Sequence, residues 1–426
     1  MNERVLVISH NSFSSLTNNG KTFESFFGGI PKQNLAQLFF SSNNDIDFDY
    51  CDNYFRITDV DVILKSVGLI SQCGNILKGQ NNKDTVLTSE GKSFKSDYIN
   101  RFILLVKKCC VLRDFIWKTR SWKTKKLEDW CLSFSPDMIF YVGGNYSFSH
   151  EVAYCISTFL KKPLITYFTD DYLIYPINRN VFDKWQKKRM EKFYRKTIDH
   201  SSLLFGIGDL MSKEYSKYFG KQFFPIMNTV SLQPYVEYKE KEPIQISYFG
   251  GLHLDRWKMI VRLAGVVKKA VVNVYTSSVP SEAIMTEFRR VGIYYRGCVE
   301  GMELKRSIQD SDILLHVESD DVYYKSLTRL SVSTKIPEYL MSGRLILGFG
   351  PCEVASMQLL LENNIGVVIT SMLSDEELEK QVTTIIQNYN LRKEIGERGY
   401  KYALQHFDNQ NVVNDFQEKI KMILNK

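Results

Sequence analysis

The chain has 426 residues, which predicts two or three domains at about 150 residues per domain. Apolar residues make up 44% and charged residues 24%, so a disordered chain, a collagen and a coiled-coil rod are excluded. The formal net charge of +7 is unevenly spread: residues 1–235 hold 31 Lys and Arg against 23 Asp and Glu, and residues 236–426 hold 24 against 25. The basic excess of the first half predicts two domains with different partners.

The cysteines and the apolar segments indicate the cellular compartment in which the protein is expected. Eight cysteines are present, none forms a C-x-x-C pair, and no histidines stand beside them at zinc spacing. This pattern argues against a structural metal and is typical of reduced thiols in a cytosol. The apolar run Val5–Ile8 is too short for a signal peptide, and no run of about 18 apolar residues could span a membrane. We therefore expect a cytoplasmic protein.

Short apolar runs alternate with helical patterns, which predicts buried parallel strands in βαβ units. The first series of expected strands is Val5–Ser9, Leu35–Phe40, Asp137–Val142, Leu164–Phe168, Leu203–Ile207 and Phe223–Met227. The second series is Ile244–Phe249, Val271–Tyr275, Ile293–Arg296, Ile313–Val317, Leu345–Gly348 and Gly366–Ile369. Two such series predict an α/β protein with two Rossmann-like, doubly wound domains that face a cleft.

The boundary between these domains is expected near Ser231–Pro243, where a charged stretch lies between prolines. We therefore predict a first domain over residues 1–235 and a second over residues 236–405. Residues 66–96 are polar and rich in Asn, Gly and Lys, and we interpret them as a loop or short-helix insertion. A helix over residues 406–426 is expected to pack back toward the first domain. The apolar stripe of Leu404, Phe407, Val412, Phe416, Ile420 and Ile423 in the last 35 residues indicates core packing.

Ligands of doubly wound sheets bind outside the carboxyl ends of the strands, so the residues that follow each strand are candidates for a site. Asn19 and Gly20 lie in a turn that could bring backbone N–H groups to a phosphate or sugar, although turn chemistry alone also explains them. Asp170 follows the strand Leu164–Phe168, where its carboxylate could bind sugar hydroxyls or exchange protons. It could equally be the N-cap of a helix.

A diglycine turn in the second half carries a stronger signal. Gly250 and Gly251 follow an expected strand and precede a helix with Arg256 and Lys258. Glycines let the backbone approach an anion, and the two cations could neutralise a diphosphate.

A second helix start lies further along the chain. Ser333 and Thr334 are good N-caps, and free N–H groups at such a start form an anion site. Glu338 lies one turn into this helix, where it could bind a ligand or only interact favourably with the helix dipole.

Three stretches form a combination that is more specific than any one of them. They are Phe249-Gly250-Gly251-Leu252 with Arg256, Lys335–Leu340 with Gly343-Arg344, and the region from Gly208-Asp209 to Met227-Asn228. Together with the tail Tyr402-Ala403…His406-Phe407-Asp408, they resemble GT-B glycosyltransferases of the retaining family-four type. That family occurs in bacterial capsule, O-antigen and exopolysaccharide pathways. The resemblance covers most of residues 200–410 and is thinner before residue 135.

The resemblance implies a nucleotide-diphosphate sugar, UDP- or GDP-linked, that is held mainly by the second domain, with no other cofactor and no metal. Glu338 matches the second Glu of the family's E-x7-E pattern, which usually bonds the ribose hydroxyls. Arg256 matches the family's Lys and would clamp the diphosphate, while the backbone at Ser333 and Thr334 would cradle the same phosphates. The first domain would bind the acceptor.

The sequence departs from the family at three places. The first Glu of E-x7-E is Leu330, and the usual Arg before the Leu is Gly251. The family's first-domain His has no clean match, and Asp170 is the nearest residue by context. Candidate replacements in the second domain are the cations Lys258, Arg329 and Lys335 and the strand-end acid Glu318.

Two other sets of residues have plainer explanations. None of the six histidines has a partner that requires catalysis, and structural roles explain them better. The D-x-D patterns of Asp45, Asp47 and Asp49 and of Asp59 and Asp61 mimic a GT-A metal site, but such pairs arise by chance and the two-sheet layout argues against that fold.

Residues 101–126 are strongly basic, with nine Lys and Arg against one Asp. Apolar residues that include Trp117 and Trp122 are interleaved with these cations, as in an amphipathic helix that lies on an anionic membrane. Residues 184–196 add seven cations and one acid. A solvated helix face is the simpler alternative, and a nucleic-acid partner is disfavoured because no recognisable nucleic-acid module is present.

The sequence therefore predicts a metal-independent, hexosyltransferase-type enzyme that transfers a sugar from a nucleotide sugar to a glycan or lipid-linked oligosaccharide acceptor, with retention. We expect it to associate peripherally with the inner face of the cell membrane. The substitution at Leu330 keeps open a sugar-nucleotide-binding scaffold without activity. A nucleic-acid-binding protein that uses the basic stretch is the third alternative.

Overall fold

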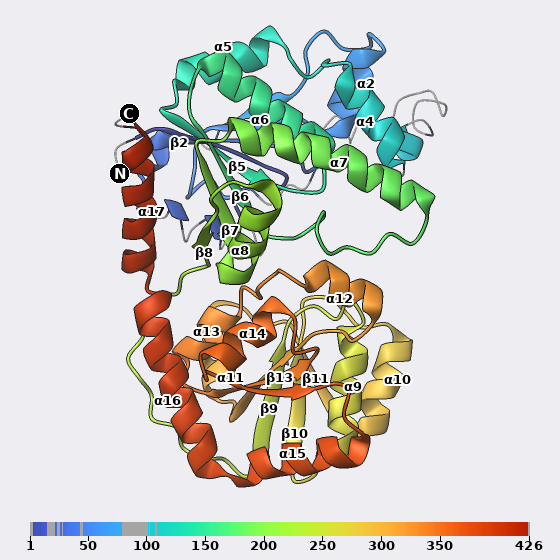
Figure 1. The fold of residues 1–426 in the computed structure, drawn as a ribbon, viewed down its shortest axis with the longest axis vertical. Helices are drawn as coiled ribbons and strands as arrows, with labels where there is room; N and C mark the ends of the chain where they lie inside the picture. The colour runs from blue at the N-terminus through green and yellow to red at the C-terminus, as the bar shows by residue number, and fades with distance from the viewer. Residues whose placement is uncertain are drawn as a thin grey trace. The chain divides into compact units, whose positions relative to one another are not determined.

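The computed structural model describes residues 3–14, 22–23, 26–27, 29–42, 46–78, 101, 103–106 and 109–424 (Figure 1). The chain forms two compact units. The first comprises Met1–Leu173, Asn178–Ile226 and Val413–Lys426, and the second comprises Ile174–Ile177 and Met227–Val412.

The first unit is built on an eight-stranded sheet of order β4-β3-β2-β1-β5-β6-β7-β8. Its strands are β1 (Val5–Ser9), β2 (Leu35–Phe39), β3 (Tyr54–Arg56), β4 (Asn75–Leu77), β5 (Met138–Gly143), β6 (Leu164–Phe168), β7 (Leu203–Ile207) and β8 (Phe224–Ile226). β4 pairs antiparallel with β3, and the other pairs are parallel. The order reverses between β1 and β5, so a doubly wound sheet with a switch point is present.

The described helices of this unit connect its strands (Figure 1). They are η1 (Lys32–Asn34), α2 (Asp59–Ser66), α4 (Cys110–Lys118), α5 (Lys125–Phe134), α6 (Ser147–Leu160), α7 (Val181–His200) and α8 (Gly208–Phe219). The basic stretch is therefore not one amphipathic helix, because a turn separates α4 from α5. Trp117 and Trp122 are only 2% and 1% exposed in the core, so the prediction that they face a membrane is wrong.

The second unit has a parallel six-stranded sheet of order β11-β10-β9-β12-β13-β14. Its strands are β9 (Ile244–Phe249), β10 (Ala270–Tyr275), β11 (Ile293–Gly297), β12 (Ile313–Val317), β13 (Leu345–Gly350) and β14 (Val367–Thr370). Its helices are α9 (Arg256–Val266), α10 (Glu282–Val291), α11 (Gly301–Gln309), α12 (Val322–Thr328), α13 (Ile336–Met341), α14 (Ala355–Glu362), α15 (Asp375–Gln387) and α16 (Tyr389–His406). The switch point lies between β9 and β12.

The predicted strands all form, with ends that differ by up to two residues. The sequence did not predict β3 and β4, because each has three residues and Arg56 interrupts the apolar pattern of β3. β4 lies in the segment that we interpreted as an insertion, and residues 79–96 of that segment fall outside the described part of the chain.

The segment that precedes β9 is bound to the second unit. The Tyr238 hydroxyl donates to Asp312 Oδ1 at 3.0 Å and accepts from Arg392 Nε at 2.9 Å. The buried Arg392 guanidinium also donates to the carbonyls of Ile385 and Ile386 at the end of α15. Because these groups satisfy one another away from water, the charged stretch around Tyr238 is tied to the second sheet.

The last helix, α17 (Asn409–Leu424), belongs to both units by sequence. Its Phe416 is fully buried, and its ring lies 5.4 to 6.0 Å from four other phenylalanine rings of the first unit, namely those of Phe26, Phe27, Phe140 and Phe205. Aromatic clusters of this kind dominate core energetics. The end of the chain therefore completes the core of the unit in which the chain began.

We expect Phe416→Ala to destabilise the first unit by about 3–5 kcal/mol, because it leaves a cavity among four rings. Met422→Ala on the same helix is the matched control, since Met422 is 68% exposed and its loss should cost less than about 0.5 kcal/mol. Urea unfolding followed by circular dichroism measures both values. Equal stabilities of the two variants would contradict the packing role of α17.

Candidate active site

The switch point of the second sheet brings two strand ends together. β9 ends at Phe249 and is followed by Gly250 and Gly251, and the neighbouring β12 ends at Val317 and is followed by Glu318. The two strands are parallel, with Leu315 opposite Tyr248, so their carboxyl ends lie at the same edge. This is the edge at which doubly wound sheets bind ligands.

The diglycine turn has no room for side chains. A Cβ atom on Gly250 would lie 2.8 Å from the Tyr248 hydroxyl and 3.3 Å from Lys335 Nζ, and one on Gly251 would collide with the His253 ring. The Tyr248 hydroxyl donates to the Gly251 carbonyl at 2.7 Å, and burial raises the pKa of Tyr248 to about 12, so this donor keeps its proton at neutral pH. The turn therefore presents bare backbone beside the Lys335 ammonium group.

Arg256, at the start of α9, forms an ion pair with Glu318. Its Nη2 lies 3.1 Å from Oε1 and 3.2 Å from Oε2 of that carboxylate, and its Nη1 lies 3.5 Å from Nε2 of His253. The side chain of Glu318 is 3% exposed and that of Arg256 is 18% exposed. A buried carboxylate needs such a partner because desolvation of an unpaired charge is costly. Glu318 thus fixes one edge of the guanidinium at the diglycine turn.

Two histidines belong to this cluster. His316 on β12 lies 3.6 Å from Glu318 Oε1 through its Nε2. Burial, and then the charges of Arg256 and Lys335, lower the pKa of His316 to about 3 and also lower the pKa of His253. Both rings are therefore neutral at pH 7. The sequence predicted structural roles for both histidines. His316 lies two residues before Glu318 and His253 lies two residues after Gly251, and this spacing was the signal that could have placed them in the site.

The turn before α13 differs from the predicted helix start. α13 begins at Ile336 with Lys335 as its N-cap, so Ser333 and Thr334 are not N-caps. The Ser333 N–H donates to the Ser356 hydroxyl at 3.0 Å, and the Ser333 carbonyl accepts from the Ile336 N–H at 3.1 Å. Because the Ser333 N–H is already bonded within the protein, it does not supply the predicted open phosphate cradle. Glu338 lies in the first turn of α13 and is half-buried.

The candidate replacement cations lie in three different settings. Lys335 lies beside Gly250, whereas Lys258 is exposed and pairs with Asp255 at 2.8 Å. The guanidinium of Arg329 lies 5.2 Å from the ring centroid of Tyr175, which belongs to the second unit. Residues two apart on a helix do not share a face, which explains why Lys258 does not join Arg256. Leu330 is fully buried and is part of the packing.

The first unit carries its own cluster at the switch point between β1 and β5. His10, after β1, stacks on Tyr146, after β5, with ring centroids 4.4 Å apart. The Arg113 guanidinium lies 4.5 Å from the Tyr146 ring centroid, and its Nε donates to Asp59 Oδ1 at 2.8 Å. Burial, and then the charge of Arg113, lower the pKa of His10 to about 4, so this ring is also neutral. These residues come from four separate segments, and no local pattern in the sequence connects them.

The other predicted residues of the first unit are Asp170, Asn19 and Gly20. Asp170 accepts a hydrogen bond from the Thr169 hydroxyl at 3.1 Å and is half-buried after β6. The next helix, α7, begins only at Val181 with Asn180 as its cap, so the N-cap interpretation of Asp170 is wrong. Asn19 and Gly20 lie outside the described residues.

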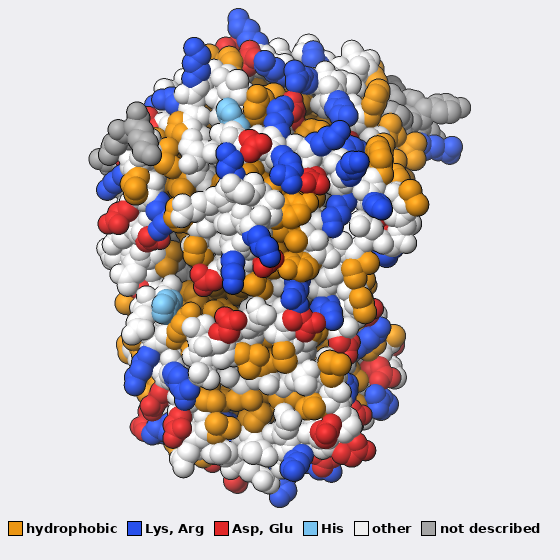
Figure 2. Space-filling view, viewed as in Figure 1, with side chains coloured by type: hydrophobic (Ala, Val, Ile, Leu, Met, Phe, Trp, Pro, Cys, Tyr) orange, Lys and Arg blue, Asp and Glu red, His pale blue; other side chains and the backbone are white. Residues whose placement is uncertain are grey.

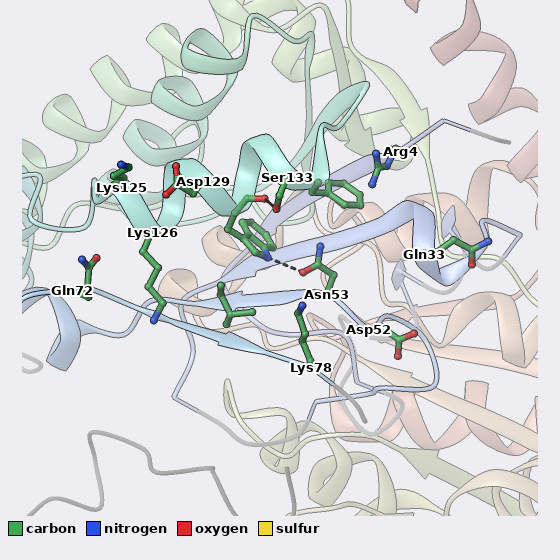
Figure 3. Close-up of a pocket in the computed structure, with 13 residues that line it drawn as sticks. Arg4, Gln33, Asp52, Asn53, Gln72, Lys78, Lys125, Lys126, Asp129 and Ser133 are labelled. Carbon is green, nitrogen blue, oxygen red and sulfur yellow. Dashed lines mark hydrogen bonds between the residues drawn. The ribbon is translucent and has the colours of Figure 1, made fainter. Parts of the chain in front are cut away.

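A pocket of about 900 Å³ lies at the opposite edge of the first sheet (Figure 3). Arg4, Gln33 and Asn53 precede β1, β2 and β3, so the pocket is at the amino ends of these strands. Its other wall is α5, from which Trp130 Nε1 donates to Asn53 Oδ1 at 2.7 Å. This pocket is therefore distinct from both switch-point clusters. The described residues include no group of three or more His, Cys, Asp or Glu that could hold a metal ion.

The state of His316 predicts a pH dependence of stability. Its pKa in the folded protein is about 3, below the usual value of 6.5, so the unfolded state binds more protons between these values. The contribution of His316 to the free energy of unfolding is complete above about pH 6.5 and is lost as the pH falls toward 3. We expect His316→Asn to flatten the fall of unfolding free energy by up to about 1.4 kcal/mol per pH unit. His406→Asn, at an exposed position, is the control, and equal slopes for both variants would contradict a buried neutral His316.

Comparisons with known proteins agree with this architecture. Residues 255–418 match a family model described as Glycosyl transferase-like. Anabaena HepE, solved with UDP and glucose, is 11% identical, with 99% of this chain and 100% of that chain covered and a TM-score of 0.62. The lipopolysaccharide outer core galactosyltransferase WaaB is 11% identical, with 98% and 99% covered and a TM-score of 0.57. No curated protein matches the sequence.

The likeness to a third structure is partial. TarM, from S. aureus, is 12% identical with a TM-score of 0.51, and the match covers 68% of this chain and 55% of that chain. The chain thus spans about half the length of TarM but the full length of HepE. The two sheets, whose strand pairs are parallel except β3–β4, and these neighbours together show that the chain has the GT-B fold. The glycosyl transferase-like match at residues 255–418 lies mostly in the second unit.

Proposed function

We propose that the protein is a glycosyltransferase that moves a sugar from a UDP- or GDP-linked donor to a glycan or lipid-linked acceptor, with retention and without a metal. The observation that carries this proposal is the anion site of the second unit. There a side-chain-free turn, Gly250-Gly251, lies beside Lys335 and close to Arg256 at the carboxyl edge of the sheet. A diphosphate needs backbone donors and fixed cations in this arrangement. The family match at residues 255–418 and the fold of HepE support the same assignment.

The chemistry follows from where charge develops. When the bond between the sugar and the diphosphate breaks, negative charge collects on the leaving diphosphate. Arg256 is held by Glu318 before the reaction, and Lys335 lies beside Gly250. Preorganised charges stabilise a transition state without reorganisation. In this proposal the two side chains provide the charge that a metal provides in other transferases. Glu338 would bond the ribose of the nucleotide, as the resemblance to the retaining family implies.

The acceptor would bind to the first unit. Its carboxyl edge presents the half-buried carboxylate of Asp170 and the aromatic cluster of His10 and Tyr146. Aromatic faces and carboxylates suit sugar rings and their hydroxyl groups. We assign Asp170 to the acceptor hydroxyl rather than to a covalent intermediate, because retention in this fold needs no protein nucleophile.

The basic stretch 101–126 would bring this unit to an anionic membrane on the cytoplasmic side. Its exposed cations include Lys118, Lys123 and Lys125, while Leu104, Leu105 and Phe115 are 53%, 55% and 68% exposed. Each cation near an anionic leaflet contributes about 1 kcal/mol. Figure 2 shows many Lys and Arg side chains on the first unit and a mixture of both signs on the second. None of the described helices is long and apolar enough to cross a bilayer.

A scaffold that binds nucleotide sugars without turnover remains the second candidate, because a buried Leu330 stands where the resembled family has an acid. Incubation with UDP- and GDP-sugars in EDTA separates the two. We expect transfer or slow donor hydrolysis, and we expect Glu338→Ala to weaken nucleotide binding about tenfold or more through lost hydrogen bonds. Nucleotide binding without turnover of any donor would favour the scaffold. An unchanged nucleotide affinity of Glu338→Ala would overturn its ribose role.

The Arg256–Glu318 pair predicts a specific energetic coupling. Glu318 contacts Arg256, so it should influence nucleotide binding through that side chain. We expect a double-mutant cycle of Arg256→Gln and Glu318→Gln, read by calorimetry with UDP, to give a coupling of at least about 1 kcal/mol. The cycle of Lys258→Gln with Glu318→Gln is the control and should be additive within about 0.5 kcal/mol. Additivity in both cycles would remove Glu318 from the site.

Charge reversal tests the membrane proposal for the basic stretch. Lys118→Glu, Lys123→Glu and Lys125→Glu alter exposed side chains and spare Lys126, whose Nζ donates to the Gly74 carbonyl at 2.8 Å. We expect the triple variant to lose binding to anionic vesicles and to keep its activity on a water-soluble acceptor. Unchanged vesicle binding at low ionic strength would refute the contact.

A further inference from the structure

The outer face of α7 begins with large apolar side chains in water. Val181 is 84% exposed, Phe182 51% and Trp185 48%. They occupy the first two turns, and because residues i and i+4 lie on one face of a helix, Val181 and Trp185 share that face. A soluble protein gains nothing from exposing three such side chains together, so this cluster indicates a partner. The same helix buries Met190, Tyr194, Thr197 and Ile198 on its other face.

Exposed cations continue the same outer face along α7. Lys184, Lys188, Lys192 and Arg195 are exposed, and their spacing of three and four residues keeps them on one side of the helix. Residues 184–196 carry seven cations against one acid. The face is thus apolar at its start and basic for the following three turns, which is the side-chain order of an interfacial anchor.

The start of α7 is held in place, so the exposure is not that of a frayed end. The Asn180 side chain accepts from the Asp183 N–H at 2.9 Å and caps the helix. Arg189 forms an ion pair with Asp114 of α4 and donates to the Ser147 hydroxyl at 3.2 Å. The Arg189 guanidinium also lies 5.5 Å from the Trp185 ring centroid. The first turns of α7 are therefore fixed against the first unit with Trp185 turned outward.

We propose that this face of α7, defined by Val181, Phe182, Trp185, Lys184, Lys188 and Lys192, docks on an anionic lipid bilayer. The apolar side chains would enter the interface, where indole and phenyl rings are favoured, and the lysines would reach the headgroups. A second copy of the chain would bring an equally basic face, and the like charges would repel. Nucleic acid would satisfy the lysines but not Val181 and Phe182. This contact uses residues other than 101–126 and rests on the proposed function, to which it adds a second surface where the first unit meets the membrane.

Vesicle binding of the full chain tests the proposal without any sugar substrate. The probes are sedimented vesicles of phosphatidylcholine alone and of phosphatidylcholine with phosphatidylglycerol. The first variant is the triple substitution Val181→Ser/Phe182→Ser/Trp185→Ser. The matched control variant is Tyr294→Ser/Met302→Ser/Leu361→Ser. The control positions lie in the second unit and are 53%, 77% and 41% exposed. We expect the first variant to bind phosphatidylglycerol vesicles at least tenfold more weakly than the unchanged chain, and the control variant to bind equally well.

Fluorescence reports whether Trp185 itself meets lipid. Trp117, Trp122 and Trp130 are at most 4% exposed, and the half-buried Trp257 of the second unit is replaced by Phe in both proteins that are compared. Brominated phosphatidylglycerol should then quench a component that is lost in Trp185→Phe. Equal vesicle binding by both triple variants, or the same quenching in Trp185→Phe, would overturn the proposal. Dimerisation abolished by the first triple variant would assign the face to a second copy, and selective binding to DNA or RNA would assign it to nucleic acid. Failure of donor turnover would bear only on the enzymatic proposal.

Discussion

The second unit depends on one buried ion pair at the switch point of its sheet. Parallel strands deliver the ends of β9 and β12 to the same edge, and there Glu318 is almost fully buried with Arg256 as its partner. The pair resolves a conflict between burial and charge, since removing the Glu318 carboxylate from water without a partner would be costly. Burial, and then the charges of Arg256 and Lys335, lower the pKa of His316 and of His253, so both rings are neutral beside the pair. The proposed anion site thus contains a cation and a carboxylate that already balance one another.

Much of the fold was predictable, because continuous apolar runs of five or six residues mark buried parallel strands. All twelve expected strands form, and the diglycine turn and Arg256 lie where strand order predicts. What the sequence could not supply were pairings between distant segments. The bond from Ser333 to Ser356, the burial of Trp117 and the stacking of His10 on Tyr146 depend on tertiary packing, and no local pattern encodes them. Short strands such as β3 fall below the length at which periodicity is informative.

The exposure and pairing of the side chains show how the uneven charge of the chain is distributed over the two units. In the first unit several cations are used internally, as Arg113 is by Asp59 and Arg189 by Asp114. Other lysines are exposed, and those on α4, α5 and α7 lie on helices that also expose apolar side chains, such as Phe115, Leu132 and Trp185. In the second unit the cations of the proposed anion site are the partly buried Arg256 and Lys335 beside the strand ends. In this proposal positive charge lies on extended surfaces of the first unit and at one site of the second unit.

The return of α17 to the first unit has a consequence for biosynthesis. Phe26, Phe27, Phe140 and Phe205 are translated early, but the ring that fills the space between them belongs to Phe416, which leaves the ribosome after the whole second unit. The first unit therefore cannot finish its core in order of synthesis and must wait, with aromatic surface exposed, until the second is made. A nascent chain in this state is a natural client for chaperones that recognise exposed aromatic surface. The core of the first unit is therefore begun first and completed last.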